Sequence, residues 1–211
     1  MPIYDWKSWL ERWNRDLLGH LDMEEYFEYV QPEEDMTPEV VASGWLGYPS
    51  ASEAEIERIE TRLGVRLPPS YRQFLQVSNG FRQPLQLVHR IFATSEVEWF
   101  RVNHQPRIDS WLNSEYVTSG RAPADSFERY LPDALEISAT EIAGSAVFLL
   151  NPRVVNADGE WEAFYYASWI PGVERCESFW ALMQREYENN LYFHQLDAAS
   201  DDDGDEDDDS R

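Results

Sequence analysis

Residues 52–80 read SEAEIERIETRLGVRLPPSYRQFLQVSNG, and this stretch decides the fold. Ser52 and Glu55 have the spacing of a capping box, in which each side chain satisfies a free backbone amide of the first helical turn. Gly64 stands where a left-handed C-terminal cap is expected. Between them, apolar residues recur at helical spacing: Ile56, Ile59 and Leu63. The pattern predicts a helix that ends at Gly64.

A second helix is predicted directly after the first. Leu67 leads into Pro68-Pro69, which can open a helix because the first helical amides need no partner. The residues predicted to be buried share one face: Tyr71, Phe74 and Leu75. Asn79-Gly80 tolerates positive φ and ends the helix. Residues 52–80 therefore predict a compact pair of helices.

The N-terminal segment also has a helical pattern. Large apolar residues recur at spacings of three and four: Trp6, Trp9, Leu10, Trp13, Leu17 and Leu21. Such a stripe either packs on the main core or forms a partner site. Proline and glycine then interrupt the chain up to residue 52, which is typical of a connector.

The rest of the chain favours short strands and a closing helix. Alternating or apolar runs predict strands, as listed here: Leu85–Val88, Leu135–Ile137, Ala146–Leu150 and Trp161–Ala167. Asp158-Gly159 predicts a tight turn. A short helix is expected after Ser95 and a longer one after Ser178, whereas 104–132 predicts no element. Helices followed by strands and a last helix indicate an α+β fold with a largely antiparallel sheet.

The run from Ala54 to Gly80 resembles the signature of the SMI1/KNR4, or SUKH, family. The matching positions are Gly64, Leu67, Pro68, Tyr71, Phe74, Leu75, Asn79 and Gly80, with Ser178 and Phe179 resembling the closing motif. The resemblance implies a SUKH-like α+β fold, with a largely antiparallel or mixed sheet backed by helices. It implies structural roles for these positions and no catalysis. We expect residues 1–44 to form an N-terminal helical extension and connector, 45–192 the SUKH domain, and 193–211 a disordered acidic tail.

The charge is strongly negative. Forty acidic and 17 basic residues give −23, of which −16 lies on residues 1–200. This field disfavours direct binding to nucleic acid or anionic membranes and favours a cationic partner. The N-terminus lacks the pattern of a signal peptide, and a single cysteine fits a reducing compartment, so a cytoplasmic location is expected.

Few residues have the type and spacing that metal binding or catalysis requires. The four histidines are scattered, so no metal site is expected and no cofactor is implied. Cys176 is a lone thiol beside two glutamates. Glu160 and Glu162 lie two apart on a predicted strand, where they form either a solvated face or a carboxylate pair for acid–base work. The sequence therefore favours a protein without catalytic activity.

The family resemblance implies binding to another protein. Bacterial members are mostly immunity proteins that silence a cognate toxin, often a nuclease, and eukaryotic members include regulatory scaffolds. We therefore expect an immunity protein with a basic toxin as partner, and a cytoplasmic scaffold or adaptor that binds host proteins as the alternative. The expected contact residues cluster near the Asp158-Gly159 turn: Asp158, Glu160, Trp161, Glu162 and Trp169.

Overall fold

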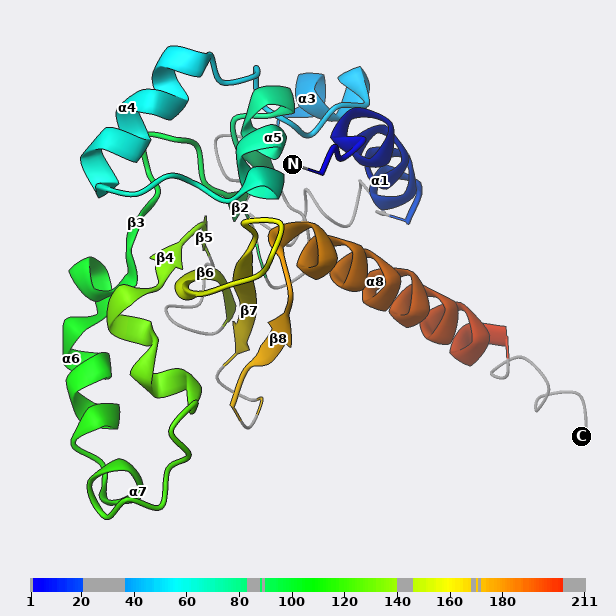
Figure 1. The fold of residues 1–211 in the computed structure, drawn as a ribbon. Coiled ribbons are helices and arrows are strands. Elements are labelled where there is room, and N and C mark those ends of the chain that lie inside the picture. The colour runs from blue at the N-terminus through cyan, green and yellow to red at the C-terminus, as the bar shows by residue number, and fades with distance from the viewer. Residues whose placement is uncertain are drawn as a thin grey trace, which may run out of the picture.

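The computed structural model describes residues 2–20, 37–82, 88, 90–139, 146–167, 170 and 172–202. A five-stranded sheet lies at the centre, with the strand order β3-β4-β6-β7-β8 (Figure 1). Its strands are β3 (Glu98–Trp99), β4 (Leu135–Glu136), β6 (Ala146–Val155), β7 (Trp161–Ala167) and β8 (Glu174–Cys176). A smaller sheet has the order β1-β2-β5, formed by β1 (Phe81–Arg82), β2 (Arg90–Ile91) and β5 (Ser138–Ala139). All pairings are antiparallel, which confirms the predicted fold class.

Helices surround the sheets. They are α1 (Trp6–His20), α3 (Pro38–Ser43), α4 (Glu53–Leu63), α5 (Pro69–Val77), α6 (Phe100–Leu112), α7 (Glu115–Thr118) and α8 (Phe179–Asp202), with short 3-10 turns at Phe127–Arg129 and Leu131–Asp133. In Figure 1, α1, α4 and α5 lie above the sheet, α6 lies beside it on the left, α7 lies lower still, and α8 extends away from the body.

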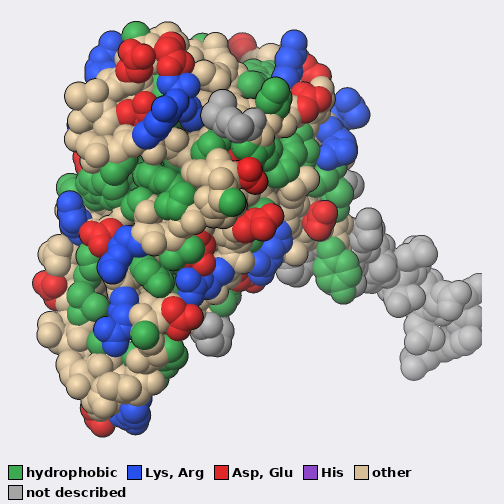
Figure 2. Space-filling model, in the orientation of Figure 1, with side chains coloured by type: hydrophobic (Ala, Val, Ile, Leu, Met, Phe, Trp, Pro, Cys, Tyr) green, Lys and Arg blue, Asp and Glu red, His purple; other side chains and the backbone are tan. Residues whose placement is uncertain are grey.

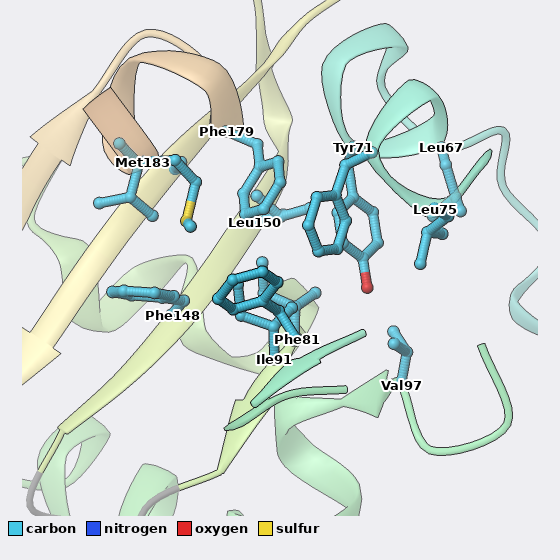
Figure 3. Packing of buried hydrophobic residues seen from close by; sticks show 14 of the residues in the cluster. Leu67, Tyr71, Leu75, Phe81, Ile91, Val97, Phe148, Leu150, Phe179 and Met183 are labelled. Carbon is cyan, nitrogen blue, oxygen red and sulfur yellow. The ribbon is translucent and has the colours of Figure 1, made fainter. Parts of the chain in front are cut away.

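The central strands are buried on both faces. On β6, Phe148 and Leu150 point into the larger core with α5 and α8, as Figure 3 shows, whereas Val147 and Leu149 point into a second core with α6. Side chains alternate along β7 in the same way, so that Phe164 joins the second core. This double burial explains why residues 146–150 of β6 form an unbroken apolar run.

The α4–α5 pair forms as predicted. The Ser52 hydroxyl accepts a hydrogen bond from the Glu55 amide at 3.3 Å, and the Glu55 carboxylate accepts one from the Ser52 amide at 2.8 Å. Gly64 ends α4 with φ +72°, and Gly80 has φ +99°. A Cβ on Gly80 would lie 2.7 Å from the carbonyl oxygen of Ile91, so only glycine fits.

Helix α1 packs on the main core. Trp6, Trp9 and Trp13 are buried, and the Trp6 indole donates a hydrogen bond to the Ser70 carbonyl at 2.9 Å. The Trp6 and Phe179 rings lie 5.4 Å apart, which joins α1 to α8. The tryptophan stripe is therefore a packing face, and α1 shares the core of the domain that follows it.

Several predicted elements differ from the structure. The segment after Ser95 is a turn followed by β3, and α6 begins only at Phe100, so the predicted helix start is wrong. Helices occupy much of 104–132, where none was expected. Helix α8 runs to Asp202, so residues 193–202 are helical and the predicted disorder from 193 is wrong for them. The expected strand at 85–88 lies, except for Val88, outside the described residues.

Candidate protein-binding surface

The β6–β7 hairpin carries most of the predicted contact residues, and its turn is rigid. The Asn156 side-chain oxygen accepts hydrogen bonds from the amides of Asp158 at 2.9 Å and Glu160 at 3.1 Å. The Asn156 amide donates to the Glu160 carbonyl at 2.9 Å, and Gly159 has φ +82°. The predicted turn at Asp158-Gly159 is confirmed, and Asp158 is exposed at its tip.

The Glu160 side chain is buried and forms hydrogen bonds within the fold. Its carboxylate is 1% exposed and accepts hydrogen bonds from the Ser70 amide at 2.8 Å, the Ser70 hydroxyl at 2.6 Å and the Tyr4 hydroxyl at 2.9 Å. Pro68, at the start of α5, supplies no side-chain cap, so Glu160 satisfies a free amide at that helix end. Burial and the hydrogen bond to Glu160 raise the pKa of Tyr4 above its usual range.

Two other predicted contact residues are also engaged within the fold. Trp161 is 6% exposed and belongs to the main core. The Glu162 carboxylate is bound by Arg175 at 2.6 Å and 3.0 Å and by the Asn151 amide group at 2.9 Å. Glu160 and Trp161 are therefore both buried, and neither side chain is exposed beside the turn.

The structure leaves the other predicted contact residues untested, and it separates the two carboxylates of the predicted pair. Asp158 is exposed, and its contact with a partner stays a prediction. Trp169 lies outside the described residues. Glu160 is bonded to α5 whereas Glu162 is bonded to β8, so the two carboxylates do not converge as the acid–base alternative required.

The hairpin exposes residues that the sequence did not point to. Asn151 pairs with Glu162 and Val155 with Trp161, so residues 152–154 have no partner on β7 and form a bulge. Val154 is 37% and Val155 52% exposed. Pro152, close behind the apolar run of residues 146–150, is the sequence signal for such a bulge.

Arg153 on the same bulge is also exposed. Its guanidinium lies 5.6 Å from the centre of the Tyr130 ring, and Nη1 is 3.4 Å from an Asp133 carboxylate oxygen. These contacts hold an extended side chain at the surface in one orientation. Exposed arginine and apolar side chains on a rigid hairpin are typical of protein-binding surfaces.

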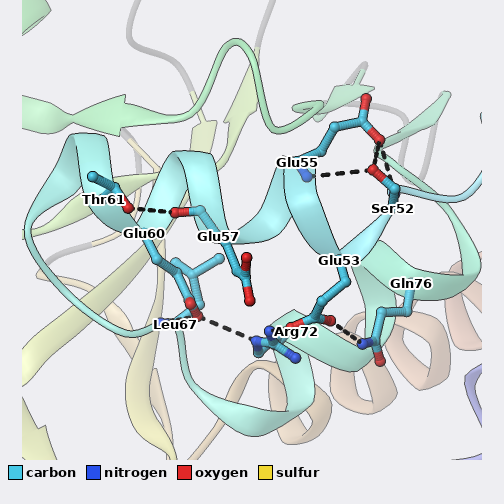
Figure 4. Close-up of polar contacts among 9 residues, drawn as sticks. All are labelled: Ser52, Glu53, Glu55, Glu57, Glu60, Thr61, Leu67, Arg72 and Gln76. Atoms are coloured by element: carbon cyan, nitrogen blue, oxygen red, sulfur yellow. Dashed lines mark hydrogen bonds and ion pairs between the residues drawn. The ribbon is translucent and has the colours of Figure 1, made fainter.

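A shallow acidic groove runs along α4. Glu53, Glu57 and Glu60 lie on one helix face, and Arg72 of α5 reaches across to Glu53 and, at 3.3 Å, to Glu60 (Figure 4). The groove is lined by Glu53, Glu57, Glu60, Thr61, Gly64, Val65, Arg66 and Arg72. The hydrogen bond from Arg72 lowers the pKa of Glu53. Within the described part of the chain, no hydrogen bond or ion pair engages the exposed Glu57 carboxylate.

Groups with potential reactivity are held in structural contacts. Cys176 is half-buried, and burial raises the pKa of its thiol, which disfavours the reactive thiolate. His104 Nε2 lies 2.9 Å from a Glu136 carboxylate oxygen and its ring stacks on Phe100. Across the described residues, no group of three or more His, Cys, Asp or Glu side chains is placed to hold a metal ion.

The positions of the family-like motif lie in the core or at turns. Leu67, Tyr71, Phe74, Leu75 and Phe179 are buried. The Asn79 side-chain oxygen accepts a hydrogen bond from the Thr94 amide at 2.8 Å, and the Ser178 hydroxyl accepts one from the Ala181 amide at 3.0 Å, which caps α8.

These features define an α+β domain whose antiparallel sheet lies between two helical layers and whose distinctive sequence positions build the fold. The model of the SMI1/KNR4 family (SUKH-1) matches residues 50–206, and the chain belongs to this family. The match begins after α1 and extends past residue 192, where we had expected the domain to end. No curated protein matches the chain. None of the helices in the described segments is long and apolar enough to span a bilayer.

Proposed function

We propose that this protein acts without catalysis, by binding a basic protein toxin and neutralising it in the cytoplasm. The observation that carries the proposal is membership of the SMI1/KNR4 (SUKH-1) family, which includes immunity-type domains. Such a role requires a stable surface that occupies the partner, and it needs no reactive group of its own.

The charge of the chain supports a basic partner. At −23, the protein produces a field that attracts cationic surfaces and repels phosphate backbones. Toxins that cleave nucleic acid carry cationic clefts, because they must bind phosphates. A strongly acidic protein would associate with such a cleft quickly, and added salt would slow the association.

The rigidity of the domain supports tight binding. The hairpin turn is fixed by Asn156, its base is fixed by the buried Glu160, and α1 is locked onto the core by tryptophans. A surface that is already ordered loses little conformational entropy when it binds, so more of the contact energy appears as affinity.

Co-expression tests the proposal. Cells that produce the toxin domain encoded beside this gene should survive when they also produce this protein, and the two proteins should co-purify. A chain with Phe74→Asp, which disrupts the core, should give no protection. Failure of the intact protein both to protect cells and to form a complex would contradict the proposed function.

A further inference from the structure

The hairpin carries two exposed valines that are neighbours in the chain, whereas the other exposed large apolar residues of the described part stand singly in the sequence: Ile3, Val102, Tyr116 and Tyr192. Most large apolar side chains in the described residues are buried, yet the bulge of β6 presents Val154 and Val155 next to each other. Exposing two neighbouring valines costs free energy in water, and a bulge that does so on a rigid hairpin is typical of a binding feature.

The hairpin and the acidic groove are joined by the α4–α5 turn, residues 64–69. Gly64, Val65 and Arg66 line the groove at one end of this turn. At the other end, a Cβ placed on Gly159 would lie 3.9 Å from Pro69 Cγ, so the hairpin tip touches the start of α5.

Val155 lies on the side of the sheet that faces these helices. It pairs with Trp161, whose side chain belongs to the core shared with α4 and α5, and paired residues of neighbouring strands share a face. Figure 2 shows hydrophobic side chains gathered in a band across this face between α4 and α6, with acidic and basic side chains over α4 beside it.

We propose that Val154, Val155 and Asp158 of the hairpin, together with Glu57 in the α4 groove, form the surface that contacts the toxin. We call these four residues the hairpin surface. The inference rests on the proposed function and adds to it the binding face and the chemistry of the partner's site. The matching site on the toxin has an apolar patch for the valines and a flanking Lys or Arg for Glu57.

The choice of a basic partner follows from charge. Arg72 forms ion pairs with Glu53 and Glu60, but its single positive charge cannot balance both carboxylates, and Glu57 is the carboxylate of the groove that no described residue pairs with. Asp158 adds a second exposed acid at the hairpin tip. An apolar centre with charges at its edge is the usual arrangement of a specific interface, in which the apolar contacts supply affinity and the charges supply rate and specificity.

Binding of the same toxin domain by single variants tests the assignment. Val155→Asp should weaken binding by about 30-fold or more, because it places a charge at a contact centre. Glu57→Gln should weaken binding less and reduce its dependence on salt. The control is Tyr116→Asp on α7, which alters an equally exposed apolar residue at the far end of the domain in Figure 1 and should leave binding unchanged.

Each outcome has a distinct meaning. If the unmodified protein binds and Val155→Asp binds equally well, the hairpin surface is wrong and the proposed function stands. If the unmodified protein does not bind at all, the proposed function fails and the hairpin surface fails with it. Hydrogen exchange of the unmodified complex gives a readout free of folding defects: amides of residues 153–159 should become protected, and unchanged exchange there would overturn the assignment.

Discussion

Glu186 offers a sharp test of the packing of α8. Its side chain is 3% exposed, and one carboxylate oxygen has no hydrogen-bond partner within the described structure. Burial and, to a smaller extent, the nearby charge of Glu174 raise its pKa to about 7, while Arg185 opposes the rise. Tyr165 and Cys176 are the other titratable groups whose pKa values are affected by Glu186.

The pKa rise fixes how stability depends on pH. The folded protein binds the proton of the Glu186 carboxyl more tightly than the unfolded chain does. The protonated carboxyl therefore makes its full contribution to the free energy of unfolding below about pH 4.5, and this contribution is lost as pH increases through about 7. A rise of the pKa from 4.5 to about 7 corresponds to about 3 kcal/mol once the group is ionised. Glu186→Gln keeps the shape of the side chain without the charge, so the variant should be up to about 3 kcal/mol more stable at pH 8.

Urea unfolding followed by fluorescence of the nine tryptophans measures this difference at pH 5 and pH 8. The variant should differ from the unmodified protein by less than about 1 kcal/mol at pH 5 and exceed it clearly at pH 8. Glu188→Gln, on the same helix but exposed, is the matched control and should change stability little at either pH. A variant that is no more stable at pH 8 would show that Glu186 is not a buried charge.

Four further substitutions, one of them an exposed control, test the packing of the domain by the same unfolding measurement. Glu160→Ala should lower the free energy of unfolding by about 3 kcal/mol, because the buried donors of Ser70 and Tyr4 lose the carboxylate that accepts their hydrogen bonds. The control Asp158→Ala removes an exposed carboxylate and should change the free energy of unfolding by less than about 0.5 kcal/mol. Ser52→Ala removes the cap of α4 and should cost about 1 kcal/mol. Trp6→Ala should cost about 4 kcal/mol if α1 belongs to the core, and a loss below about 1 kcal/mol would make α1 a detachable extension.

Local signals explain what the sequence could predict. The α4–α5 pair was predictable because capping residues, glycines and apolar spacing all lie within residues 52–80 and agree with one another. The first half of β6 was predictable, because burial of residues 146–150 on both faces demands an unbroken apolar run. Helix α6 was missed because Pro106 lies inside it and His104, with φ −126°, interrupts the helical backbone.

The surroundings of the predicted contact residues were harder to predict, because the residues that determine them are distant in the chain. Glu160 looked like a surface acid, but the residues that bury it, Tyr4 and Ser70, are 156 and 90 positions away. Trp161 likewise enters a core built by helices from both ends of the chain. The exposure of Val154 and Val155 depends on the bulge, which is a property of the pairing with β7 and not of β6 alone.

Titration of the toxin with purified protein addresses the central claim most directly. The toxin encoded beside the gene would be assayed for its own activity while this protein is added at low and at high salt. We expect activity to disappear at about one equivalent at low salt, with weaker inhibition at high salt. Full toxin activity in the presence of excess folded protein at low salt would contradict the account.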